Sequence, residues 1–90
     1  MKTDVLLINL EKLAKNLNIK IIQDKNLRNS GGFCRYQDRY YLILKSKLPD
    51  KIKINYYIKA IAKVLPEDYY VLPYIRELIE QERSAIINEQ

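Results

Sequence analysis

The stretch FCRYQDRYYLILK, residues 33 to 45, decides the fold because its pattern predicts a β-hairpin. We expect a first strand over 33–37, a turn at Gln37, Asp38 and Arg39, and a second strand over 40–45. Side chains alternate between the two faces of a strand. The second strand therefore has two largely apolar faces, made by Tyr40, Leu42 and Leu44 and by Tyr41, Ile43 and Lys45. This pattern predicts that the second strand lies at the centre of the sheet.

Upstream of the hairpin, the sequence predicts a helix over 4–18 and a short strand over 19–23. The helix carries an apolar stripe at helical spacing, formed by Leu6, Leu10, Leu13 and Leu17. The strand segment IKIIQ is rich in β-branched residues, which favour strands. The polar, turn-forming segment DKNLRNSGG, residues 24–32, predicts a loop that leads into the hairpin.

Downstream of the hairpin, the sequence predicts two helices, over 51–65 and over 73–86. Pro66 and Pro73 separate them, because proline interrupts a helix but suits its first turn. The element order is therefore helix, strand, strand, strand, helix, helix. We expect one α+β domain over residues 1–90, with a three-stranded, mainly antiparallel sheet and helices packed on one face.

Length and composition are those of one small globular domain: 90 residues, of which 48% are hydrophobic and 30% charged. Charged side chains interrupt the apolar positions near the N-terminus, at Asp4, Glu11 and Lys12, and no apolar run reaches the length of a membrane span. We therefore expect neither a signal peptide nor a membrane-spanning segment. The single cysteine cannot form an internal disulfide, which favours a reducing, cytoplasmic location.

Charge is distributed unevenly along the chain. Residues 1–63 carry 14 Lys and Arg against 5 Asp and Glu, whereas residues 64–90 carry 2 against 6. The net charge of +5 therefore combines a basic body with an acidic C-terminal segment. This asymmetry predicts either polyanion binding by the body or pairing of the two parts between copies of the chain.

The chain contains no histidine, which removes the commonest general acid–base group and the commonest metal ligand near neutral pH. The sequence has no Walker A motif, and its two glycines cannot supply GxGxxG. We therefore expect no catalytic residue, no cofactor and no metal site.

Cys34 has two interpretations. A nucleophilic thiol needs a lowered pKa, and Arg28 or Arg35 offers positive potential for that, but no histidine is present to act as its base. A structural cysteine is a small hydrophobic side chain that is often buried. We favour the structural interpretation.

Gly31 and Gly32 also have two interpretations. Successive glycines expose backbone N–H groups that bind anions, with Arg28 and Ser30 alongside. Alternatively, a glycine adopts a positive φ angle where the loop enters the hairpin. We favour the second interpretation, because the segment precedes a strand rather than a helix N-terminus.

A polar row runs along the helix expected over 51–65, because Lys51, Asn55, Lys59 and Lys63 recur at every fourth position. Together with Arg28, Arg35 and the eight tyrosines, this row makes a candidate surface for nucleic acid or another anion. The alternative is a solvated helix face, with tyrosines at the edge of the core.

Tyrosines near the acidic segment make a candidate protein interface, formed by Tyr69, Tyr70 and Tyr74. A homodimer that sets the acidic helix of one copy near a basic helix of the other uses the charge asymmetry. It also adds buried area to a small core.

The segments LEKLAKNLNIKI, SGGFCRYQDRYYLILKSKLP and KAIAKVL resemble small uncharacterised bacterial proteins with an SGGxCR segment followed by a strand, a loop and a helix. The element order also resembles, more remotely, zinc-dependent peptidases that cleave phage and stress repressors and carry HExxH on a helix. The corresponding slot here reads Lys59-Ala60-Ile61-Ala62-Lys63, and a lysine ammonium does not ligate zinc. The peptidase resemblance therefore implies a site without metal or catalytic residues.

These observations favour a non-enzymatic domain that binds a protein partner or itself. The alternative is a nucleic-acid-binding module centred on the lysine row, and the third hypothesis is an enzyme that depends on Cys34.

Overall fold

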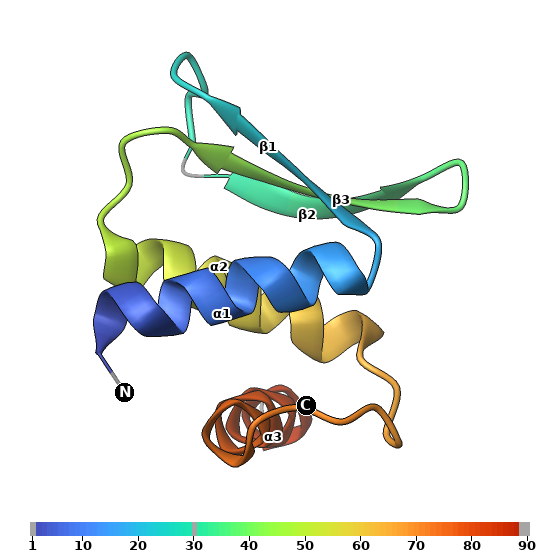
Figure 1. Ribbon diagram of the computed structural model, residues 1–90. Coiled ribbons are helices and arrows are strands. Elements are labelled where there is room, and N and C mark those ends of the chain that lie inside the picture. Colours follow the sequence, from blue (N-terminus) through green and yellow to red (C-terminus); the bar gives the residue numbers. More distant parts are fainter. Residues whose placement is uncertain (1, 30, 89–90) are drawn as a thin grey trace.

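The computed structural model describes residues 2–29 and 31–88. Its elements are α1 (Thr3–Asn16), β1 (Ile19–Asp24), β2 (Gly31–Tyr36), β3 (Arg39–Lys45), α2 (Asp50–Val64) and α3 (Pro73–Asn88) (Figure 1). The predicted α+β class and the predicted order of elements are confirmed.

The three strands form one sheet in the order β1-β3-β2, so β3 lies at its centre, as its two apolar faces predict. β2 and β3 form the antiparallel hairpin, whereas β1 runs parallel to β3. The sheet is therefore mixed rather than mainly antiparallel. The reason is that β1 lies on the far side of β3 instead of beside β2, the strand that follows it in the chain.

The hairpin turn is one residue shorter than predicted. Tyr36 pairs with Arg39, which leaves a two-residue loop of Gln37 and Asp38 and makes Arg39 the first residue of β3. Both loop residues have positive φ angles, of 51° and 64°, as a type I′ turn requires. The Asp38 carboxylate accepts a hydrogen bond from the Arg35 guanidinium at 3.0 Å across this turn.

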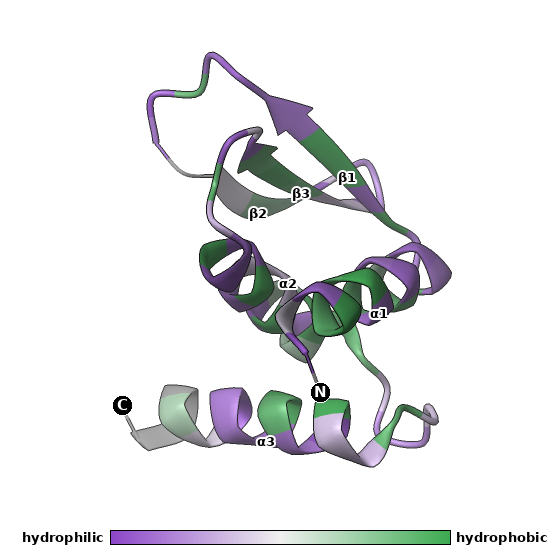
Figure 2. Cartoon of the chain, turned by 60° about the vertical axis from the view of Figure 1, so that its left-hand side comes forward, coloured by the Kyte–Doolittle hydropathy of each residue, from purple (hydrophilic) through white to green (hydrophobic). Residues whose placement is uncertain are grey.

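The chain is arranged in three layers. The sheet packs with one face on α1 and α2, and α3 packs against α2 on the side away from the sheet (Figures 1 and 2). The core lies mainly between these layers, and its most deeply buried large side chains are Leu10, Leu42, Leu44, Tyr57, Ile61 and Ile79. No described helix covers the other face of the sheet.

Arg83 joins α3 to the end of α2. Its Nε donates to the carbonyl of Ala62 at 3.0 Å, and its Nη2 donates to the carbonyl of Leu65 at 2.8 Å. The last carbonyls of a helix lack hydrogen-bond donors within the helix and lie at the negative end of its dipole. A guanidinium supplies both the missing donors and a positive charge. The acidic C-terminal helix is thus anchored to the basic body through one of its two arginines.

Tyr57 on α2 is only 1% exposed. We expect this burial to make the stability of the fold fall as the pH rises through the alkaline range. Burial, and to a smaller extent the negative charge of Glu11, raises the pKa of Tyr57 from 10.0 to about 12. The folded protein therefore keeps this proton at pH values at which the unfolded chain loses it. The resulting stabilisation is fully present below the unfolded pKa of about 10 and is lost as the pH rises to about 12.

The measurement for Tyr57 is the melting temperature as a function of pH, for the wild type and for Tyr57→Phe. We expect the wild type to lose stability more steeply between about pH 10 and pH 12, because phenylalanine has no proton to release. If the melting temperatures of the two proteins fell in parallel as the pH rises, this would contradict a buried Tyr57 hydroxyl that stays neutral in the folded protein.

Candidate functional site

The polar row of Lys51, Asn55, Lys59 and Lys63 lies on α2, as predicted, and all four side chains are exposed. Its last member contacts an aromatic ring, because the Lys63 Nζ lies 5.5 Å from the centre of the Phe33 ring. Lys63 also lies in the last turn of α2, where a positive charge suits the helix dipole.

An aromatic pair connects this row to Arg35. The rings of Phe33 and Tyr40 stack with their centres 5.5 Å apart and their planes 11° apart. The Arg35 guanidinium carbon lies 5.8 Å from the centre of the Tyr40 ring. The structure thus brings Lys63 and Arg35 to one cluster, in which each ring contacts the other ring and one cation. Arg28 is not part of it, since it lies in the β1–β2 loop, at the end of the sheet opposite the hairpin turn (Figure 1).

Cys34 is exposed, so the expected burial of its side chain is wrong. Cys34 alternates with Arg35 along β2, and the face that Cys34 shares with Tyr36 is the one that no described helix covers. Since the thiol is exposed, its alkylation in the native protein would report exposure rather than catalysis. Among the described residues, no group of three His, Cys, Asp or Glu side chains is placed to hold a metal ion.

Gly31 has the positive φ angle that we expected of a glycine entering the hairpin, at 146°. A Cβ atom at this position would lie 2.1 Å from the backbone oxygen of Ile43 on β3. At Gly32, by contrast, a Cβ atom meets nothing within 4 Å. A glycine is thus required at position 31 because the backbones of β2 and β3 approach each other closely there. Ser30, another residue of the candidate anion-binding segment, lies outside the described residues.

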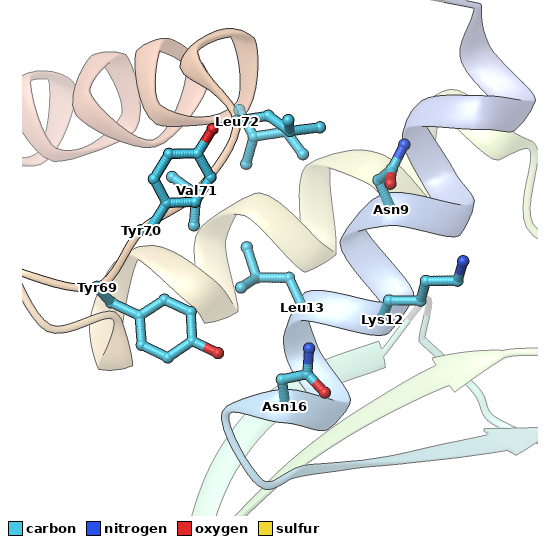
Figure 3. Close-up of a pocket in the computed structure, with 9 residues that line it drawn as sticks. Asn9, Lys12, Leu13, Asn16, Tyr69, Tyr70, Val71 and Leu72 are labelled. Atoms are coloured by element: carbon cyan, nitrogen blue, oxygen red, sulfur yellow. The ribbon is translucent and has the colours of Figure 1, made fainter.

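A groove separates α1 from the segment that joins α2 to α3, and we call it the α1 groove. It has a volume of about 230 Å³ and is lined by Asn9, Lys12, Leu13 and Asn16 of α1, by residues 69–72 and by Ile75. Figure 3 shows Leu13 pointing across it towards the 69–72 segment. Two of the three tyrosines predicted to form an interface, Tyr69 and Tyr70, line this groove.

The α1 groove has an apolar rim. Tyr70 and Leu72 line the groove and are exposed, and three further exposed apolar side chains, Val5, Ile8 and Tyr74, lie on the two helices that contribute to its lining. Tyr70 is 77% exposed, whereas Tyr69 is half-buried and packs against the core. Tyr74 adjoins the groove from the first turn of α3, next to Ile75. Two of the three predicted tyrosines therefore line the groove, and the third is exposed on the first turn of the adjoining helix.

Sequence reasoning missed Val5, Ile8 and Leu72. Val5 and Ile8 lie outside the leucine stripe that α1 buries. Apolar residues outside the buried stripe of a helix indicate a second apolar face, so the sequence did contain a signal for these two residues. Leu72 carries no such signal, because it lies in an irregular segment.

Comparisons with protein-family models, with curated proteins and with solved structures found no match. The resemblances drawn from the SGGxCR segment and from the element order therefore stay predictions. Within residues 2–29 and 31–88, no helix has both the length and the apolar character needed to cross a membrane.

Proposed function

We propose that this chain is a non-enzymatic, self-associating interaction domain and that the α1 groove with its apolar rim is its contact surface. The observation that supports this proposal most strongly is the clustering of exposed apolar side chains. Of the eight large apolar side chains exposed in the described part of the chain, five belong to this rim. Exposed apolar side chains that cluster around a groove mark interaction surfaces, whereas single ones do not.

Exposed charges on α1 and α3, the two helices that line the α1 groove, favour a second copy as the occupant. Lys12 lines the groove from α1, and Glu77 lies one turn after Tyr74 on the exposed face of α3. Neither forms an ion pair with any described residue of its own chain. In the proposed dimer, a two-fold axis sets α1 of each copy against the exposed face of α3 of the other, with Lys12 opposite Glu77 twice.

This arrangement also uses the uneven charge of the chain. The acidic residues 64–90 of one copy approach the basic residues 1–63 of the other, which stabilises the pair and discourages the reverse orientation. Rim tyrosines suit such an interface because the ring buries apolar area while the hydroxyl meets water at the edge.

Sedimentation velocity over a range of protein concentrations tests self-association. We expect a reversible dimer, and we expect Ile8→Lys to raise its dissociation constant roughly tenfold or more, because a charge enters the apolar rim. Ile52→Lys is the matched control, since Ile52 is a similarly exposed isoleucine that lies on α2 beside Asn55, Tyr56 and Lys59 rather than on a helix that lines the groove. A wild type that stays monomeric at millimolar concentration would contradict the proposal, as would equal weakening by both variants.

A further inference from the structure

The uncovered face of the sheet is a second candidate surface, and we call it the open sheet face. Alternation from the buried Leu42 and Leu44 places Tyr41 and Ile43 of β3 on this face. The register adds Lys20 and Ile22 of β1 on one side, and Cys34 and Tyr36 of β2 on the other. Ile22 and Tyr36 are both exposed, and Tyr36 is 62% exposed.

Cations surround these side chains. Lys20 lies beside Tyr41 in the register, Arg39 pairs with Tyr36, and Lys45 ends β3 on the same face. Lys15, Lys20 and Arg39 also line a hollow of about 510 Å³ at the junction of α1 and β1, and none of the described residues that line it is acidic. Asp24 is the acid at the end of β1 on this face; it lies beside Lys45 in the register and accepts a hydrogen bond from the Asn26 N–H at 2.8 Å.

The two tyrosines of this face differ from the aromatic pair at the end of α2. Phe33 and Tyr40 stack on each other and contact Lys63 and Arg35, so their ring faces are occupied. Within the described chain, the rings of Tyr36 and Tyr41 have no such contact with a ring or a cation. The exposed Tyr36 and the half-buried Tyr41 are therefore the rings of this face that remain available to a flat ligand.

A second copy of the chain does not fit this face. Two open sheet faces packed on each other would bring together two surfaces that each carry Lys20, Arg39 and Lys45 against the one acid Asp24, and like charges across an interface are unfavourable. The occupant must instead be negatively charged and offer rings for stacking. We infer that the open sheet face binds single-stranded nucleic acid, with Lys20, Arg39 and Lys45 on phosphates and bases stacked on Tyr36 and Tyr41.

The physical basis is that single strands are held by cations along the backbone and by base stacking on aromatic side chains. Three cations on phosphates predict that log K falls against log salt with a slope of about −2. This site is distinct from the lysine row of α2, for which the sequence analysis predicted the same class of ligand, and from the α1 groove.

The test is fluorescence anisotropy with a labelled oligothymidylate. Lys20→Glu/Arg39→Glu and Tyr36→Ala should each weaken binding roughly tenfold or more. The control is Lys51→Glu/Lys59→Glu, which makes the same change of charge on α2 and should weaken binding only slightly. Tyr36 is largely exposed, so Tyr36→Ala keeps the test decisive if the charge variant fails to fold.

Three outcomes would overturn the inference. If the α2 control abolishes binding while the sheet variants retain it, the lysine row is the site. If a duplex of the same length binds as tightly as the single strand, base stacking has no role. If polyglutamate displaces the oligonucleotide at equal charge, the surface binds anions without recognising bases. The inference also requires that oligothymidylate binds the wild type at low salt, and absence of binding there would overturn it as well.

Discussion

Gly31→Ala should destabilise the protein by about 3–4 kcal/mol, out of a total of roughly 5–13 kcal/mol for a domain of this length. Two effects combine. A φ angle of 146° is strained for any residue with a Cβ atom. In addition, the new methyl group would lie 2.1 Å from the backbone oxygen of Ile43, so β2 must move away from β3. Moving β2 disturbs the hairpin that organises the sheet.

The measurement is the free energy of unfolding from denaturant titration, and the adjacent glycine provides the control. A methyl group at Gly32 meets nothing within 4 Å, so Gly32→Ala should change stability by less than about 0.5 kcal/mol. Equal losses in the two variants would show that β2 and β3 do not approach each other as described.

Leu42→Ala should also be severe, at about 3 kcal/mol, because Leu42 is fully buried at the centre of the sheet. Its side chain packs between β3 and the helices, and its removal leaves a cavity that the surrounding strands and helices cannot fill. The next residue of the same strand, Ile43, points to the open sheet face and is only half-buried. Ile43→Ala should therefore cost about 1 kcal/mol or less.

Chemical denaturation of the two β3 variants measures this difference directly. A loss at Ile43 as large as that at Leu42 would mean that something covers the open sheet face in solution. That result would contradict the burial of only one face of β3. It would also contradict the proposed binding of nucleic acid, which requires the open sheet face to be accessible.

The sequence predicts the elements well because each has its own periodicity. The leucine stripe of α1, the alternation along β3 and the prolines between α2 and α3 are local signals, and the observed bounds differ by a few residues at most. The central place of β3 also agrees with its local pattern, since largely apolar residues on both faces are more typical of strands inside a sheet than of its edges.

The pairing of β1 and the hairpin turn were harder to predict. Pairing β1 parallel to β3 depends on which edge of the hairpin is free, and no residue in β1 specifies that choice. The turn lacks a glycine, yet Gln37 and Asp38 both adopt positive φ angles. Aspartate tolerates this region, whereas glutamine is rarely found there, so the local preference is overruled by the pairing of Tyr36 with Arg39.

The candidate sites were predicted in part. Tyr69 and Tyr70, which line the α1 groove, and the exposed lysine row were singled out from residue type and spacing, but Cys34 was expected to be buried. Whether a strand face is buried depends on how many layers cover the sheet, which is a property of the whole fold. For the same reason the sequence could not show that Lys20, Arg39 and Tyr41 share an uncovered face.

The most direct test of self-association through the α1 groove is a charge exchange between Lys12 and Glu77, read as the dimer dissociation constant by sedimentation equilibrium at low salt. Lys12→Glu and Glu77→Lys should each weaken the dimer, because each sets like charges against each other twice. Combining the two reversals restores opposite charges, so the double variant should dimerise nearly as tightly as the wild type. A double variant weakened by the sum of the two single effects would contradict the two-fold pairing of α1 with α3.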